Sequence, residues 1–259
     1  MAGMIRVARF EEMGRTFWAL LEGDDRAREA DGDPFRGLRP VGAPRTLGGL
    51  RWRPPISPSK IVGVGRNYRA HAAEFGNDVP AEPLLFLKPP SALIAHEEAI
   101  RLPSVSRRVD YEGELGVVIG RTARAVPERS ARDFVLGYTC VIDVTARDLQ
   151  KRDVQFTRAK GFDTFCPVGP CLAIGVDPAA LAIETRLNGV VVQRGRIADM
   201  VHGIARLVSA ISAVMTLEPG DLIATGTPEG VGQLRPGDDV EVVVTAIGSL
   251  RNRVVAEAV

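Results

Sequence analysis

Lysine, histidine and cysteine are scarce in this chain of 259 residues. Its 33 basic residues include four lysines, so arginine is the ordinary cation. Three histidines are too few for a histidine-rich transition-metal site, so any metal site is expected to use oxygen ligands, which favour Mg²⁺, Mn²⁺ or Ca²⁺. Cys140, Cys166 and Cys171 are odd in number, have no CxxC spacing and lie in apolar surroundings. They predict buried free thiols rather than a disulfide or a zinc site.

The chain also has no long hydrophobic run and no large excess of positive or negative charge. No apolar stretch approaches the roughly 20 residues that span a bilayer. Arg6, Arg9 and two glutamates interrupt the N-terminus, which therefore has no signal-peptide pattern. The formal net charge of +1 indicates no polyanionic partner. We therefore expect a cytoplasmic protein that binds neither nucleic acid nor membrane.

The composition, with 45% hydrophobic residues, predicts a globular chain with a full core. Strand patterns separated by turns at residues 5–10, 16–21 and 26–28 predict a small antiparallel unit. Residues 31–58 are rich in Gly, Pro and Arg, which predicts a poorly structured connection. We therefore predict a β-rich N-terminal domain with its linker over residues 1–55, and a second domain over residues 56–259.

Strands dominate the predictions for the second domain. Apolar runs predict strands at residues 60–65, 84–87, 115–119, 134–142, 172–174, 183–187, 190–193, 222–225, 239–245 and 250–255. Helical patterns cover residues 69–75, 146–153 and 201–215. Gly63 and Gly65 lack the third glycine of a dinucleotide-binding fingerprint, so no nucleotide cofactor is expected.

Residues 110–120, Asp-Tyr-Glu-Gly-Glu-Leu-Gly-Val-Val-Ile-Gly, set two carboxylates immediately before an apolar run. In a strand, Glu112 and Glu114 share one face, and Gly113 leaves the other face uncrowded. Unpaired carboxylates at the start of a buried strand are costly to desolvate, so one interpretation is that a cation lies between them. The other interpretation is an exposed strand end whose glutamates face water. These residues alone do not decide between the two.

His71 and Glu74 lie three residues apart in a segment with helical spacing. Such neighbours share a helix face, where a carboxylate can hold a histidine in one tautomer and tune it as a base. An exposed helix with an incidental polar pair is the alternative. Residues 75–83 then form a loop that can cover a site.

Six segments of the sequence identify a protein family. Their order and spacing along the chain are more specific evidence than any single segment. The segments are Val64-Gly-Arg-Asn-Tyr68, Phe86-Leu-Lys-Pro89, Asp110-Tyr-Glu-Gly-Glu-Leu115, Gly137-Tyr-Thr139 with Asp143-Val-Thr-Ala-Arg-Asp148, Ala159-Lys-Gly-Phe-Asp-Thr164, and Thr225-Gly-Thr-Pro-Glu-Gly-Val-Gly232. Together they resemble the fumarylacetoacetate hydrolase family over residues 56–259. The small N-terminal unit resembles that of bacterial members described as 2-hydroxyhepta-2,4-diene-1,7-dioate isomerases, and the motifs are similar to those of acylpyruvate hydrolases.

The resemblance implies an α+β fold that is mostly β, with a catalytic domain of mixed sheets in a roll and a small antiparallel N-terminal unit. It also implies a divalent ion, Mg²⁺ or Mn²⁺ with Ca²⁺ as a further option, bound by Glu112, Glu114 and Asp143. Lys160 matches the active-site lysine of the family. A 2-oxo acid can chelate such an ion, which then stabilises the enolate that develops when a bond to C3 breaks.

The remaining site residues follow from the same resemblance. His71 and Glu74 match the pair that activates water or moves a proton in acylpyruvate hydrolases and oxaloacetate decarboxylases. Thr227 matches the threonine that contacts the substrate carboxylate, although its motif alone indicates a tight turn. Arg66 and Gln150 are candidates for the distal end of the substrate, with an exposed salt bridge and an exposed helix position as their alternatives.

We therefore predict a metal-dependent enzyme that acts on 2-oxo or 2-hydroxydienoic acids. The reaction is either acylpyruvate-type C–C hydrolysis or an isomerisation and decarboxylation of intermediates in aromatic-compound breakdown. Hydration of a 2-oxopent-4-enoate is one alternative, and a noncatalytic metal-binding β module is another. The family commonly forms homodimers through the catalytic domain, so a homodimer is expected.

Overall fold

Within residues 3–257, which the computed structural model describes, most strands belong to one mixed sheet of 13 strands. Its main path has the order β4-β3-β2-β1-β15-β13-β12-β18-β7-β8, and β5, β6 and β9 pair at its side. The strands are β1 (Ile5–Glu12), β2 (Arg15–Leu21), β3 (Arg26–Asp33), β4 (Gly37–Pro40), β5 (Arg45–Thr46), β6 (Arg51–Arg53), β7 (Ile61–Gly65), β8 (Leu84–Lys88), β9 (Leu93–Ile94), β12 (Gly113–Ile119), β13 (Val135–Ile142), β15 (Cys166–Ile174) and β18 (Leu222–Ala224).

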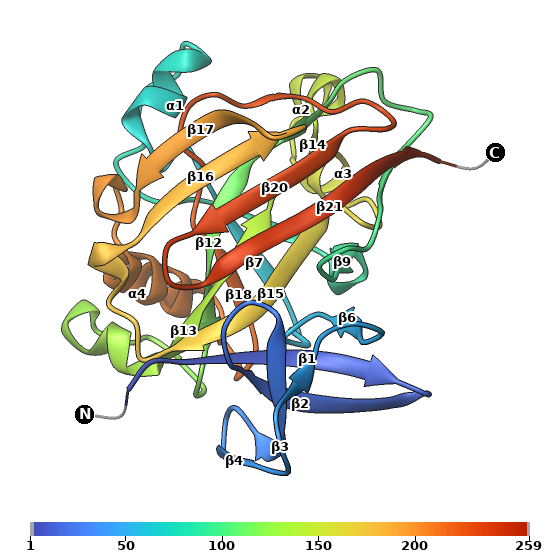
Figure 1. Cartoon of the computed structure of the whole chain (residues 1–259). Helices are drawn as coiled ribbons and strands as arrows, with labels where there is room; N and C mark the ends of the chain where they lie inside the picture. The colour runs from blue at the N-terminus through green and yellow to red at the C-terminus, as the bar shows by residue number, and fades with distance from the viewer. Residues whose placement is uncertain (1–2, 258–259) are drawn as a thin grey trace.

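A second sheet of five strands has the order β10-β21-β20-β16-β17, and a third has the order β14-β11-β19, both within the described residues. Their strands are β10 (Ile100–Leu102), β11 (Val109–Tyr111), β14 (Thr145–Ala146), β16 (Ala182–Leu187), β17 (Val190–Arg196), β19 (Gly232–Gln233), β20 (Asp239–Val244) and β21 (Gly248–Ala256). In Figure 1, β16, β17, β20 and β21 form a layer in front of β12, β13 and β15. The predicted fold, mostly β with mixed sheets, is confirmed.

Helices are short and lie at the margins of the sheets (Figure 1). They are α1 (Arg69–Glu74), α2 (Arg147–Arg152), α3 (Thr157–Lys160) and α4 (Ile204–Val214), with 3₁₀ turns η1 (Pro90–Ala92), η2 (Glu128–Phe134), η3 (Pro178–Ala180) and η4 (Ile197–Asp199). The helix predicted over residues 201–215 is present as α4, which begins at Ile204 and ends at Val214, and its Ile204, Leu207, Val208 and Ile211 side chains are buried. No helix in the part of the chain that the structure describes is long and apolar enough to cross a membrane.

The prediction of a poorly structured connection over residues 31–58 is wrong. Strand β3 continues to Asp33, and β4, β5 and β6 follow it in the same sheet. These strands carry few apolar residues and are held by backbone pairing and by exposed ion pairs. In one of these pairs, Nη1 and Nη2 of Arg15 in β2 donate to Glu29 in β3, at 2.6 and 2.8 Å. Because such strands bury little apolar surface, they lack the alternation of polar and apolar residues that predicts a strand.

The N-terminal strands continue the large sheet instead of forming a separate one. Strand β1 pairs antiparallel with β15, and Ile5 lies opposite Ile174. The ring of Trp52 in β6 meets the ring of His96 edge-on at 4.9 Å. Nδ1 of His96 accepts a hydrogen bond from the backbone N–H of Arg251 at 2.9 Å. Burial, followed by the charge of Arg251, lowers the pKa of His96 to about 4, so this contact contains a neutral imidazole at neutral pH.

Side-chain burial bears out the interpretation of the cysteines. Cys140, Cys166 and Cys171 are all buried and free. Burial raises the pKa of the Cys166 and Cys171 thiols to about 12, so they are protonated and unreactive at neutral pH.

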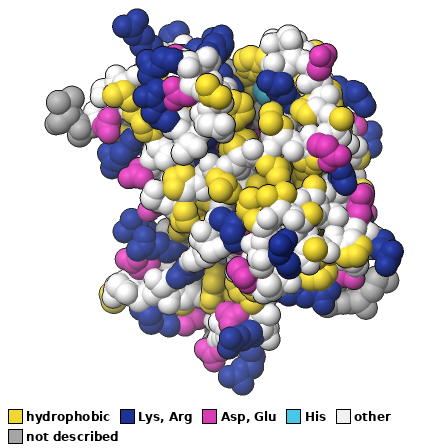
Figure 2. Space-filling view, turned by 180° about the vertical axis from the view of Figure 1, so that it is seen from behind, with side chains coloured by type: hydrophobic (Ala, Val, Ile, Leu, Met, Phe, Trp, Pro, Cys, Tyr) yellow, Lys and Arg dark blue, Asp and Glu magenta, His cyan; other side chains and the backbone are white. Residues whose placement is uncertain are grey.

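On the face opposite the layer of β16, β17, β20 and β21, hydrophobic side chains gather near the centre and charged side chains lie around them (Figure 2). Contiguous apolar surface of this kind is typical of binding surfaces.

Candidate active site

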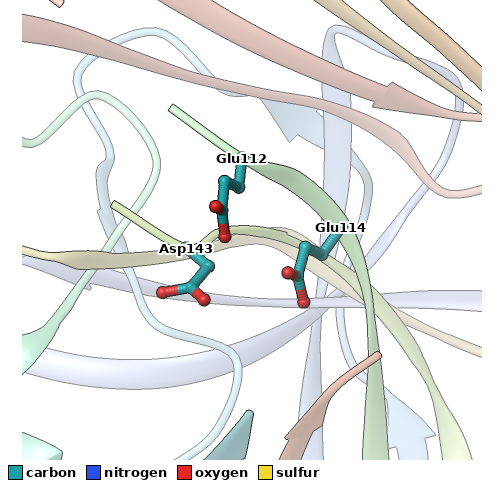
Figure 3. Close-up of side chains that lie close together, drawn as sticks. All are labelled: Glu112, Glu114 and Asp143. Atoms are coloured by element: carbon teal, nitrogen blue, oxygen red, sulfur yellow. The ribbon is translucent and has the colours of Figure 1, made fainter. Parts of the chain in front are cut away.

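The pairing of β12 with β13 brings the three predicted carboxylates together. Gly113 lies opposite Ile142 in this antiparallel pair, and the backbone N–H of Asp143 donates to Glu112 O at 2.8 Å. Carboxylate oxygens of Glu112, Glu114 and Asp143 all lie within 4.8 Å of one another. Figure 3 shows the three carboxylates turned toward one common space. All three side chains are buried, so the alternative of an exposed strand end does not hold.

Gly113 allows a second strand to approach the two glutamates from behind. A Cβ atom at this position would lie 2.0 Å from Thr185 Oγ1 and 3.0 Å from Val242 Cγ2. The prediction that Gly113 leaves its face uncrowded is therefore wrong. The face is filled by β16 and β20, because a buried strand start packs against the second sheet and glycine lets the backbones come close.

Two buried lysines each donate a hydrogen bond to a different oxygen of the Asp143 carboxylate. Lys160 Nζ donates to Asp143 Oδ2 at 2.5 Å and to Glu112 Oε2 at 2.8 Å. Lys88 Nζ donates to Asp143 Oδ1 at 2.7 Å and to Val144 O at 3.3 Å. The short helix α3 presents Lys160, and the edge strand β8 presents Lys88. Lys88 was not predicted as a site residue, although the scarcity of lysine and its place in a Phe-Leu-Lys-Pro segment are a usable signal.

Arg147 is a further residue of the site that the sequence interpretation missed. Its Nη2 donates to Glu112 Oε1 at 2.5 Å, its Nε donates to Asp110 Oδ2 at 3.0 Å, and its Nη1 donates to Gln150 Oε1 at 2.8 Å. Its guanidinium carbon lies 5.0 Å from the centre of the Phe75 ring. A basic residue on a charged helix is usually exposed, so only the packing of α2 against β11 identifies Arg147 as buried.

The charged groups shift one another's pKa values. Burial raises the pKa of Glu112, but the charges of Lys160 and Arg147 lower it by a larger amount. The pKa of Glu112 therefore lies well below the ordinary glutamate value. Burial lowers the pKa of Lys160, but the negative charges of Asp143 and Glu112 raise it by a larger amount. The pKa of Lys160 therefore lies above the ordinary lysine value. Glu112 and Lys160 are therefore an ion pair at neutral pH.

Glu114 differs from the other two carboxylates because it makes no ion pair within residues 3–257. Its Oε2 accepts a hydrogen bond from the backbone N–H of Gly226 at 2.8 Å. Burial, and then the negative charges of Asp143 and Glu112, raise its pKa well above the ordinary value. A cation among the three carboxylates would relieve this repulsion. The donor set, with its three carboxylates, fits Mg²⁺ or Mn²⁺.

A cavity of about 320 Å³ opens onto the carboxylates. Seven of the nine predicted site residues line it: Arg66, His71, Glu112, Glu114, Gln150, Lys160 and Thr227. Glu74 and Asp143 do not line it. Phe75, Phe86 and Phe156 supply an apolar part of the wall. The cavity thus combines an acidic end with basic and aromatic walls.

Helix α1 places His71 at the cavity and Glu74 behind it. His71 is 8% exposed, and its Nδ1 lies 3.4 Å from Glu74 Oε2, close to it but without hydrogen-bond geometry. The Glu74 carboxylate accepts long hydrogen bonds from the backbone N–H of Gly230, at 3.3 and 3.4 Å. His71 is therefore buried at the cavity, whereas Glu74 is exposed and connects α1 to the loop that follows Thr227.

Two further candidates, Arg66 and Thr227, lie on the connections that follow β7 and β18. Arg66 has a φ of 56°, a left-handed conformation that is uncommon for a residue with a side chain and is concentrated at functional sites. The hydroxyl of Thr227 donates to Gly113 O at 2.9 Å and accepts from Gln193 Nε2 at 2.8 Å. Thr227 therefore connects its turn to the strand of the two glutamates.

Comparisons with known proteins agree with this geometry. A family profile described as fumarylacetoacetate (FAA) hydrolase C-terminal matches residues 60–255, and one described as Rv2993c-like, N-terminal matches residues 5–55. The solved structure of 2-hydroxyhepta-2,4-diene-1,7-dioate isomerase from Mycobacterium marinum is 44% identical, with a TM-score of 0.90, and the match covers 98% of this chain and 100% of that one.

Two further relatives have names that describe an activity. The oxaloacetate tautomerase YisK of Bacillus subtilis is 43% identical over 224 residues, which are 81% of this chain and 74% of that protein. Maleylpyruvate hydrolase from Sphingobium sp. SYK-6, solved with manganese(II) and pyruvate, is 32% identical with a TM-score of 0.82 and covers 98% of this chain and 100% of that one. The chain belongs to the fumarylacetoacetate hydrolase family of enzymes.

Proposed function

We propose that this chain is a divalent-metal-dependent enzyme that promotes enolisation of 2-oxo or 2-hydroxydienoic acids. The reaction that follows is C–C hydrolysis of an acylpyruvate, or isomerisation and decarboxylation of a dienoate. The observation that carries the proposal is the buried group of Glu112, Glu114 and Asp143 at the end of a cavity that also contains Lys160 and His71. Relatives that are named tautomerase, isomerase and hydrolase support it, because one enolate intermediate serves all three reactions.

In this proposal, Glu112, Glu114 and Asp143 hold Mg²⁺ or Mn²⁺. When bound, the ion supplies a Lewis acid for the negative charge that develops on the 2-oxo oxygen of the substrate. The manganese(II) and pyruvate in the structure of the maleylpyruvate hydrolase support this choice of metal and of substrate class. Lys160 donates hydrogen bonds to Glu112 and Asp143 and adds positive charge at the same end of the cavity.

His71 is the group in the cavity that suits proton transfer. A neutral imidazole can take a proton from C3 of the substrate or from an attacking water and return it later. Glu74, which lies behind His71 on α1, has a carboxylate oxygen 3.4 Å from Nδ1 of the ring, close enough to accept a hydrogen bond from it after a small movement of either side chain. The pair therefore moves protons at the carbon next to the 2-oxo group.

The basic and amide groups on the wall bind the rest of the substrate. Arg66 and Gln150 line the cavity, and Lys151 on α2 also lines it. These groups suit a substrate with a second polar or anionic end. The aromatic wall, including Phe86 and Phe156, suits the flat carbon chain of an acylpyruvate or a dienoate.

The test is a substrate panel measured with purified protein in chelator and after addition of Mg²⁺ or Mn²⁺. The panel contains oxaloacetate, acylpyruvates, a 2-hydroxyhepta-2,4-diene-1,7-dioate and 2-oxopent-4-enoate. We expect turnover of at least one 2-oxo acid that chelator abolishes and Mn²⁺ restores. Glu114→Gln should lower turnover by at least about 100-fold, whereas Glu82→Gln, an exposed carboxylate paired with Arg206, should not change it. Full turnover in chelator would contradict the proposal.

A further inference from the structure

We propose that Gln193 is a positioning residue of the active site. Its side-chain amide holds the strand of the metal-binding carboxylates and the turn that carries Thr227 in one fixed arrangement. The catalytic consequence of this role rests on the proposed function. The geometric part rests only on the contacts of the amide group.

Gln193 lies in β17 of the five-stranded sheet and is 2% exposed. Its Oε1 accepts a hydrogen bond from the backbone N–H of Gly113 at 3.0 Å. Its Nε2 donates to Thr227 Oγ1 and to Pro228 O, each at 2.8 Å. Both amide protons and the carbonyl oxygen are therefore used. A buried amide with every donor satisfied is rigid, because losing any partner would leave a buried polar group unpaired.

The strand end that Gln193 contacts is the one that sets the metal site. Gly113 is the residue between Glu112 and Glu114, so a shift of its peptide group moves both carboxylates. Gln193 reaches this peptide because β16 approaches Gly113 closely, and Thr185 lies opposite Gln193 in the pairing of β16 with β17. The second sheet therefore fixes the position of two metal-binding side chains through one backbone N–H.

Thr227 belongs to the same unit. A hydroxyl has one proton, and that of Thr227 is donated to Gly113 O at 2.9 Å, while its oxygen accepts from Gln193. Gln193, Gly113 and Thr227 thus form a closed ring of three hydrogen bonds. In this arrangement, the Thr227 hydroxyl has no proton left for the carboxylate of a substrate. The competing possibility is that this hydroxyl binds the substrate directly and independently of Gln193.

Two substitutions of Gln193 distinguish the hydrogen bond that its amide oxygen accepts from those that its amide nitrogen donates. Gln193→Met keeps the length of the side chain and removes every hydrogen bond. Gln193→Glu keeps an oxygen for Gly113 N–H but sets a second oxygen against Pro228 O, which cannot donate, and against Thr227 Oγ1, which can donate to it only by giving up its hydrogen bond to Gly113 O. Thr227→Val removes the hydroxyl, and Thr227→Ser keeps it. Asn252→Leu is the matched control, because Asn252 is a fully buried amide that donates to Ala95 O and Glu98 O away from the cavity.

The measurement is Mn²⁺ affinity without substrate, by titration, together with kcat and KM for the best substrate of the panel. Gln193→Met and Gln193→Glu should each raise the Mn²⁺ Kd about 10-fold or more, as loss of a group that orients metal ligands does. Thr227→Val should behave alike, and Thr227→Ser should lose less. The double variant Gln193→Met/Thr227→Val should be within about 2-fold of the worse single variant, because the residues act as one unit. Asn252→Leu should bind Mn²⁺ normally.

Two results would overturn the positioning role. One is an Mn²⁺ Kd within about 2-fold of the unsubstituted protein for both Gln193 variants. The other is a double variant whose loss equals the product of the two single losses, because Gln193 and Thr227 would then act independently rather than as one unit. If the unsubstituted protein binds no Mn²⁺, the proposed function fails, and hydrogen exchange by NMR still decides the geometric part. Gln193→Met should then speed exchange of the Gly113 amide, and an unchanged rate would refute the contact.

Discussion

Replacing Lys88 with methionine tests whether a residue outside the cavity holds the metal-binding carboxylates in place. The Lys88 side chain is 0% exposed, and its ammonium lies 2.7 Å from Asp143 Oδ1. Lys88 does not line the active-site cavity, so it does not touch a substrate there. Methionine has a similar length and no charge. The substitution therefore removes one of the two cations that hold Asp143 and leaves Lys160 as the other.

The size of the effect follows from the geometry of this pair. At 2.7 Å and an effective dielectric constant of about 20, the attraction between unit charges is about 6 kcal/mol, part of which is offset by the desolvation of the lysine. Removing one partner of a buried pair costs about 3–5 kcal/mol. Because Lys160 still contacts Asp143 at 2.5 Å, we expect the lower end, about 3 kcal/mol. For a chain of this size, that loss lowers Tm by about 6–12 °C.

The assay is urea unfolding in chelator, followed by Mn²⁺ titration of the folded protein. Without Lys88, only Lys160 still holds the Asp143 carboxylate, and Asp143 Oδ1 has lost its ammonium partner, so the Mn²⁺ Kd should rise about 10- to 100-fold. Lys60→Met is the matched control. Its ammonium lies 2.5 Å from Asp221 Oδ2, a buried carboxylate outside the cavity. This control should lower stability and leave Mn²⁺ affinity unchanged.

A loss below about 1 kcal/mol for Lys88→Met, together with unchanged Mn²⁺ affinity, would refute the reasoning. It would mean that Lys160 and the backbone hold Asp143 without help. Equal losses of Mn²⁺ affinity in Lys88→Met and Lys60→Met would also refute it, because the effect would then be one of general destabilisation.

Three further predictions concern the proton-transfer pair, the glycine behind the carboxylates and the buried histidine. His71→Ala and Glu74→Gln should each lower kcat and leave oxalate affinity nearly unchanged, and the double variant should cost little more than one of them; additive losses would separate the pair. Gly113→Ala should lower stability by about 1–3 kcal/mol and weaken Mn²⁺ binding, because its new methyl group has no room; a normal Mn²⁺ Kd would contradict this. For His96, the pKa is about 4 in the folded state and 6.5 in its ordinary state, so the unfolded chain binds the extra proton first. Stability should therefore be complete above pH 6.5 and fall by about 3 kcal/mol as the pH drops to 4, and His96→Asn should remove this part of the slope in urea unfolding across that range.

The local pattern of residues in the sequence was sufficient to predict several features of this protein. The apolar spacing of residues 201–215 is a property of neighbouring residues, and α4 forms within this range and buries Ile204, Leu207, Val208 and Ile211. The three free cysteines are buried, as their apolar surroundings indicate. The order of the motifs was sufficient for the family and for the candidate carboxylates, because Glu112 directly precedes β12, Glu114 lies within it and Asp143 directly follows the paired strand β13.

Tertiary structure alone decided which groups surround those carboxylates. Lys88 meets Asp143 across 55 positions of sequence, and Gln193 meets Gly113 across 80. Neither contact leaves a periodic pattern in the chain, because each joins strands or sheets that meet only after folding. The strands within residues 31–58 also depend on partners elsewhere in the chain, since they bury little apolar surface of their own. A charged or amide side chain looks the same in the sequence whether it is solvated or buried, and only its partners in the folded chain determine which of the two it is.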